Sequence, residues 1–110
     1  MSVLNEEIVG GLLMIKREGF FGNLISVYER DALRLIDEIA TLDNSKTLEE
    51  AAHALKSASV SIGAHLVGEE AFVLETAGRN GELPERTDAV DRLRERLNEA
   101  LAELRTRIPG

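Results

Sequence analysis

The apolar residues of this chain recur at intervals of three and four along most of its length. That spacing places side chains on one face of an α-helix, whereas a β-strand would need sustained alternation of apolar and polar residues. We therefore expect an all-α fold, an antiparallel up-down four-helix bundle with a short additional N-terminal helix. A length of 110 residues suits one domain, so residues 1–110 are predicted to form a single helical bundle domain.

Glycines and capping residues predict where the first three helices begin and end. A short helix is expected from about Asn5 to Arg17, and a long one from about Phe20 to Thr41. Thr47 followed by Glu50 has the spacing of a capping box, which predicts the start of the third helix. Gly63 is expected to end or bend that helix.

Two more helices are expected in the second half of the chain. The fourth is predicted to reach about Ala77 and to be stopped by Gly78 and by Asn80-Gly81. Pro84 is then expected to open the way to the last helix. The apolar positions of that last helix are Val90, Leu93, Leu97, Leu101, Leu104 and Ile108.

The third expected helix has two distinct faces, because each residue advances by about 100°. One face is an apolar stripe of the kind that a bundle helix buries, made of Leu48, Ala51, Ala52, Leu55, Ser59 and Ile62. His53 points well away from that stripe. The residues that share its side of the helix are Lys56, Ser57, Val60 and Ala64. The predicted surface is therefore a basic strip of mostly small residues, centred on one histidine.

The residues around this histidine carry a resemblance to a known family. The segment Ala52-His53-Ala54-Leu55-Lys56-Ser57 is followed by Gly63-Ala64, Val67, Ala71 and Leu74-Glu75. In that pattern the chain resembles the histidine phosphotransfer (HPt) domain family. The likeness spans most of the chain, since residues 20–42 also resemble the long helix that precedes the motif. Ser57 departs from the glycine that most often follows the lysine in this family.

The resemblance implies that His53 accepts a phosphoryl group through Nε2 and relays it reversibly between aspartates of receiver domains. Imidazole can act as a nucleophile near neutral pH without a strong base, and Lys56 and Ser57 are expected to stabilise the phosphoryl oxygens. Val60, Gly63 and Ala64 are expected to contact the partner. The partners implied are a response-regulator receiver domain and a hybrid histidine kinase. The alternative is an interaction module that docks a receiver domain without accepting phosphate.

Composition argues against several other classes of function. The formal net charge is −7, which disfavours nucleic-acid binding, and three phenylalanines and one tyrosine offer few platforms for base stacking. There is no cysteine, so a reducing cytoplasm is the expected compartment. The apolar run from Ile8 to Ile15 is far shorter than the roughly 20 residues of a membrane span, so membrane insertion is not expected. We expect a monomer.

Neither a metal site nor a nucleotide site is expected. Glu50 and His53 have the Glu-x-x-His spacing of di-iron bundles, but His65 lacks such a partner. Two histidines without cysteine supply a closed zinc site poorly. No phosphate-binding glycine loop or kinase motif is present, so the chain is predicted to be a phosphoryl carrier without a cofactor and not an enzyme.

Overall fold

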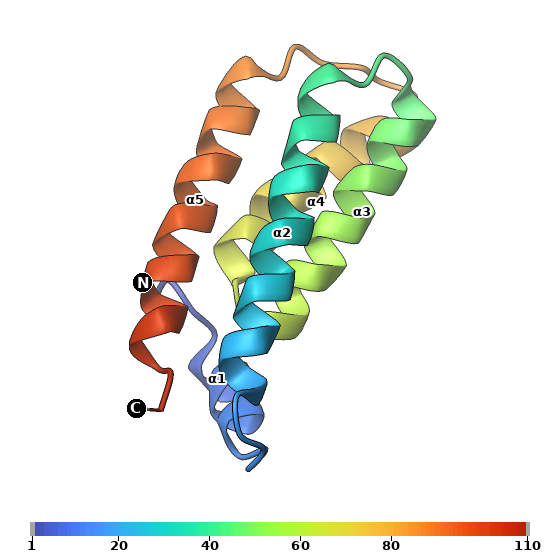
Figure 1. Ribbon diagram of the computed structural model, residues 1–110. Helices are drawn as coiled ribbons and strands as arrows, with labels where there is room; N and C mark the ends of the chain where they lie inside the picture. Colours follow the sequence, from blue (N-terminus) through green and yellow to red (C-terminus); the bar gives the residue numbers. More distant parts are fainter. Residues whose placement is uncertain (1, 110) are drawn as a thin grey trace.

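The computed structural model describes residues 2–109, and within them every regular element is a helix. The long helices α2, α3, α4 and α5 lie side by side, with α2 and α4 running in one direction and α3 and α5 in the other (Figure 1). The short helix α1 lies at one end of this bundle. The all-α prediction is therefore confirmed. The helices are α1 (Glu6–Leu13), α2 (Phe20–Thr41), α3 (Ser45–Ile62), α4 (His65–Arg79) and α5 (Thr87–Thr106).

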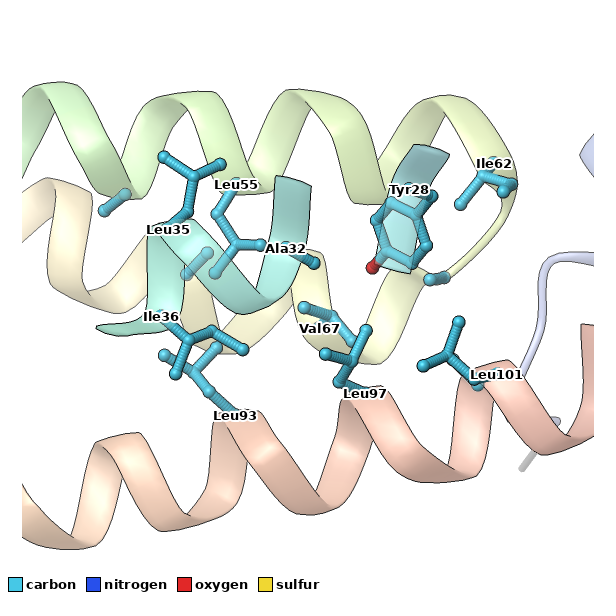
Figure 2. Close-up of a cluster of buried hydrophobic side chains, with 14 of the residues drawn as sticks. Tyr28, Ala32, Leu35, Ile36, Leu55, Ile62, Val67, Leu93, Leu97 and Leu101 are labelled. Carbon is cyan, nitrogen blue, oxygen red and sulfur yellow. The ribbon is translucent and has the colours of Figure 1, made fainter. Parts of the chain in front are cut away.

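The core lies where the helical periodicity placed it. All six residues of the apolar stripe predicted on α3 are buried. Leu55 and Ile62 of this stripe belong to the same buried cluster as Leu35 and Ile36 of α2 and Leu93 and Leu97 of α5, as Figure 2 shows. One polar contact lies inside this core, where the hydroxyl groups of Tyr28 and Ser59 are 2.7 Å apart. This contact joins α2 to α3.

Several helix ends differ from the sequence-based expectation. Helix α1 stops at Leu13 instead of continuing to Arg17. Helix α3 begins earlier than the predicted capping box, because the Asn44 side chain accepts hydrogen bonds from the backbone N–H groups of Lys46 and Thr47. The capping-box prediction is therefore wrong. The expected end of α3 is confirmed, since Gly63 follows the helix with a φ of 89°, a conformation that favours glycine.

The second half of the chain also departs from its predicted boundaries. Helix α4 passes through Gly78 and ends at Arg79, so Gly78 is not a stop signal, whereas the predicted stop at Asn80-Gly81 is confirmed. Helix α5 begins at Thr87, three residues after Pro84. Ile108 lies beyond the end of α5 and is exposed.

Glycines let α3 and α4 pack closely. A Cβ atom on Gly78 would lie 2.6 Å from the carbonyl oxygen of Ser45, and one on Gly68 would lie 3.0 Å from a Val60 methyl group. Gly68, Ala71, Glu75 and Gly78 are all buried and follow one another at intervals of three and four along α4. Glu75 is thus the only long side chain in this row, and it lies at a place where its small neighbours leave room.

The N-terminal segment packs against the turn between α3 and α4. The backbone N–H of Asn5 donates to the carbonyl oxygen of Gly63 at 2.8 Å. A Cβ atom on Gly63 would lie 2.9 Å from a Val9 methyl group, so this residue has no room for a side chain. Among the described residues, no helix is both long enough and apolar enough to cross a membrane.

Candidate functional site

The candidate site is centred on His53, which projects from the middle of α3 on the side of α4. Its side chain is 60% exposed, so the imidazole is open to an approaching molecule. The helix is rigidly placed at this point, because Ala52 and Leu55 on either side of His53 are fully buried. The core packing of α3 therefore fixes the direction in which the histidine points.

A buried carboxylate lies directly behind the histidine. Glu75 of α4 is 1% exposed, and its two oxygens are shared among three side chains. Oε2 is 3.0 Å from Nδ1 of His53 and accepts a 2.6 Å hydrogen bond from Nη2 of Arg79. Oε1 is 3.2 Å from Nζ of Lys56. Three basic side chains thus converge on one acidic group.

These contacts keep Glu75 ionised. Burial alone acts to raise the pKa of this carboxyl group, because it disfavours the charged form. The hydrogen bond with His53 and the ion pair with Lys56 outweigh burial and hold the pKa of Glu75 below its ordinary value. Near neutral pH, Glu75 is therefore an anion that can only accept hydrogen bonds.

An ionised Glu75 determines how the histidine protons are arranged. Because the carboxylate can only accept, Nδ1 of His53 carries the proton that lies between them. In a neutral imidazole the proton is then absent from Nε2, which retains its lone pair. Within residues 2–109, no protein group forms a hydrogen bond with Nε2 of His53. The neutral form of His53 thus presents Nε2 as the ring nitrogen without a proton and without a protein partner among the described residues.

The structure places the other predicted site residues unequally. Lys56, Ser57 and Val60 lie on the same side of α3 as His53, and Ser57 and Val60 are exposed. Lys56 is partly buried because it turns toward α4, where it meets Glu75. These positions agree with the helical phase from which they were predicted.

Gly63 and Ala64 do not lie on this surface, and here the expectation needs correction. Helix α3 ends at Ile62, so the helical phase that placed Ala64 beside His53 no longer applies. Ala64 precedes α4 and is 0% exposed, while Gly63 is buried under the N-terminal segment. Neither residue is open to direct contact with a partner, and their role here is to make the turn.

Sequence reasoning assigned no role to Glu75 or Arg79, although both complete the site. The guanidinium of Arg79 bridges two acidic groups, with Nε 3.2 Å from Oε2 of Glu49 and Nη2 on Glu75. A signal for Glu75 existed in the sequence. It occupies a position of α4 that falls in the row of small, buried residues, where a carboxylate needs partners to be tolerated.

Metal ligation finds no support in the side-chain arrangement. Across the part of the chain that the structure describes, no group of three or more histidine, cysteine, aspartate or glutamate side chains could hold an ion. Glu50 and His53, which have the spacing of a di-iron element, have no second such pair facing them.

A helical bundle that exposes one imidazole nitrogen and backs the other with a carboxylate has the features of a phosphoryl acceptor. The Hpt domain family model matches residues 23–106, and the chain belongs to this family. Among solved structures, a rice protein assigned as a histidine-containing phosphotransfer protein has the same fold, with a TM-score of 0.81 and 22% sequence identity. The match covers 94% of this chain and 79% of the rice chain. No curated protein matches the sequence significantly.

Proposed function

We propose that this chain is a phosphoryl carrier that relays a phosphoryl group between receiver-domain aspartates through Nε2 of His53. The observation that supports this most directly is the pairing of Nδ1 with the buried Glu75 carboxylate, because it leaves Nε2 exposed with its lone pair available. The same contact orients the ring, so the nucleophile needs little reorganisation before it reacts.

In the proposed transfer, the Nε2 lone pair attacks the phosphorus of an aspartyl phosphate on the opposite side from the aspartate oxygen. The N–P bond forms as the P–O bond breaks, and the electron pair of that bond leaves with the aspartate carboxylate. The imidazole becomes positively charged while Nδ1 keeps its proton. Glu75 stabilises that developing charge because its carboxylate already faces Nδ1 at 3.0 Å.

Lys56 supplies a cation one helical turn from His53, near the place where the phosphoryl oxygens would lie. Its ammonium group would offset their negative charge, and the exposed Ser57 hydroxyl would donate a hydrogen bond to them. Phosphoryl transfer depends mostly on positioning and charge stabilisation, so the aspartate and a divalent cation can both belong to the partner. The chain would then carry the group without being an enzyme itself.

The proposed partners are a response-regulator receiver domain and a hybrid histidine kinase, met in the cytoplasm. Val60 is 50% exposed on the side of α3 that carries His53 and would contact the receiver. Ser57 and Ser61 continue this side toward a shallow apolar groove between α2 and α3, lined in part by Leu24, Val27 and Ala58. Small and apolar groups beside the nucleophile would let a receiver domain approach closely.

The test is intact mass spectrometry after mixing the chain with a phosphorylated receiver domain. Wild type is expected to gain one phosphoryl group that is lost in mild acid, and His53→Gln is expected to gain none. His65→Gln is the matched control, because His65 is the other histidine of the chain. Its Nε2 contacts the carbonyl oxygen of Ser2, whereas Glu75 pairs with His53. Binding without any gain, from a folded wild-type chain and several receivers, would favour the docking-module alternative instead.

A further inference from the structure

Phe72 is an exposed aromatic residue at the edge of the His53 site, and the proposed function does not yet use it. It lies on α4 three residues before Glu75, so the two side chains share one face of that helix. The side chain is 48% exposed and therefore contributes only part of its surface to the core. Single exposed apolar residues are common on protein surfaces, so a functional role for Phe72 depends on what it contacts.

The contact that distinguishes Phe72 is with Lys56. The ammonium nitrogen of Lys56 lies 5.0 Å from the centroid of the Phe72 ring, within the range of a cation–π interaction. The same nitrogen is 3.2 Å from Oε1 of Glu75. Lys56 is therefore held from two sides by groups of α4, and one of these groups, the Glu75 carboxylate, also contacts His53.

The two contacts differ in what they demand of the ammonium group. A carboxylate accepts an N–H, whereas the face of an aromatic ring attracts the positive charge without needing a directed hydrogen bond. An ammonium group has three N–H donors. Holding it partly through the ring leaves donors available for the oxygens of a phosphoryl group on His53.

We infer that Phe72 is a positioning residue for phosphoryl transfer, which acts by holding Lys56 beside His53. This inference rests on the proposed function and adds to it a residue that does not touch the reacting atoms. It also distinguishes Phe72 from Val73, the next residue on α4, which is 64% exposed and makes no contact of this kind with a cation among the described residues.

The experiment uses phosphoramidate, a small phosphoryl donor that has no protein surface to dock. The initial rate of His53 phosphorylation is measured by mass spectrometry for wild type, Phe72→Leu, Phe72→Tyr and Val73→Ala, each also made with Lys56→Gln. Phe72→Leu keeps the apolar bulk but removes the aromatic face, so it is expected to slow phosphorylation roughly two- to fivefold. Phe72→Tyr and Val73→Ala should react like wild type, and Phe72→Leu should have no further effect in the Lys56→Gln chain.

Three results would overturn the inference. If Phe72→Leu slows the reaction equally with and without Lys56, the ring does not act through the lysine. The same variants are also assayed with a phosphorylated receiver domain as the donor. If the loss appears only with that donor, and Val73→Ala shares it, Phe72 is a docking contact. A wild-type chain that takes no phosphoryl group would instead remove the proposed function, and the positioning role with it. Ring-current shifts of the Lys56 ε-protons, compared between wild type and Phe72→Leu, test the contact itself in either case.

Discussion

Two polar side chains of the described residues are buried, and they have opposite surroundings. Ser59 of α3 is 0% exposed and meets the hydroxyl of Tyr28, which is itself buried. Glu75 of α4 is 1% exposed, but its partners His53, Lys56 and Arg79 all reach the solvent. The Tyr28–Ser59 pair is neutral and lies inside the core. Glu75 is a buried charge whose partner side chains are at least partly exposed to solvent.

The difference separates a structural contact from an organised site. The two neutral hydroxyl groups form a hydrogen bond with each other inside the core. The Tyr28–Ser59 contact therefore joins α2 to α3 and has a structural role. Burying a carboxylate costs far more than burying a hydroxyl unless it is paired. Glu75 is paired at an open surface with two cations, Lys56 and Arg79, and with Nδ1 of His53, and that arrangement fixes the ring of His53. The costlier buried group is therefore the one connected to function.

Glu75→Gln would break the charged half of this comparison and should have the largest effect. A glutamine keeps the shape but loses the charge that favours the proton on Nδ1 and stabilises the imidazolium formed during transfer. The rate of His53 phosphorylation is expected to fall roughly 10- to 100-fold, a loss similar to that caused by removing the carboxylate behind a metal-ligating histidine. The rate with a phosphorylated receiver domain and the ¹⁵N chemical shifts of the His53 ring nitrogens measure the two consequences.

Glu49→Gln is the matched control for that variant. Glu49 belongs to the same chain of ion pairs, since it contacts Nε of Arg79, but it does not touch His53. Its replacement should leave both the rate and the ring-nitrogen shifts close to wild type. An equal loss in both variants would mean that the general charge of the surface matters, and not the carboxylate behind Nδ1.

Most of the fold was predictable because it depends on a repeating pattern. The apolar stripe of α3 is buried at all six predicted positions, and α2 has its predicted bounds. The helix ends were harder because they depend on contacts made elsewhere in the chain. Gly78 indicates a helix stop in local terms, yet α4 continues through it to Arg79. A glycine is needed at this position because the close approach of Ser45 leaves no room for a side chain.

The site was predictable only where it lies on one helix. Helical phase placed Lys56 and Val60 beside His53, since the three residues are separated by short, regular steps on α3. The partner of Nδ1 comes from α4, and no periodicity tells which residue of one helix faces a given residue of another. Glu75 reaches His53 because small residues bring the two helices together, and that distance is a tertiary property.

The neutral half of the comparison can be tested by alkaline titration. Burial raises the pKa of Tyr28 to about 12, with its hydrogen bond to Ser59 opposing part of that rise. A pKa raised in the folded state contributes stability below the ordinary value of 10.0 that is lost as the pH rises through about 12. The free energy of unfolding should therefore decrease by about 2 to 3 kcal/mol over this interval.

Tyr28 is the one tyrosine of the chain, so ultraviolet absorbance reports its ionisation directly. The folded protein should titrate near pH 12 and the urea-unfolded protein near the ordinary value of 10.0. Tyr28→Phe should lack the part of the alkaline stability loss that belongs to this group. Titration of the folded chain at the ordinary value would show that the hydroxyl is open to solvent.

The smallest expected effect is the coupling between Tyr28 and Ser59. Ser59→Ala leaves the tyrosine hydroxyl buried without a partner, which should cost about 1 to 3 kcal/mol of unfolding free energy. Tyr28→Phe should cost less, because a serine inside a helix can turn its hydroxyl toward the carbonyl oxygen four residues earlier.

The double variant Tyr28→Phe with Ser59→Ala removes both hydroxyl groups, so neither is left unsatisfied. It should regain most of the stability lost by Ser59→Ala alone, which gives a coupling energy of about 1 to 2 kcal/mol from urea unfolding. Replacing both His53 and Glu75 with glutamine should show no such recovery, because Lys56 would lose its anion and Arg79 would keep only Glu49. Recovery at both places would mean that Glu75 and His53 form a simple pair like Tyr28 and Ser59, and that Lys56 and Arg79 are not part of the same site.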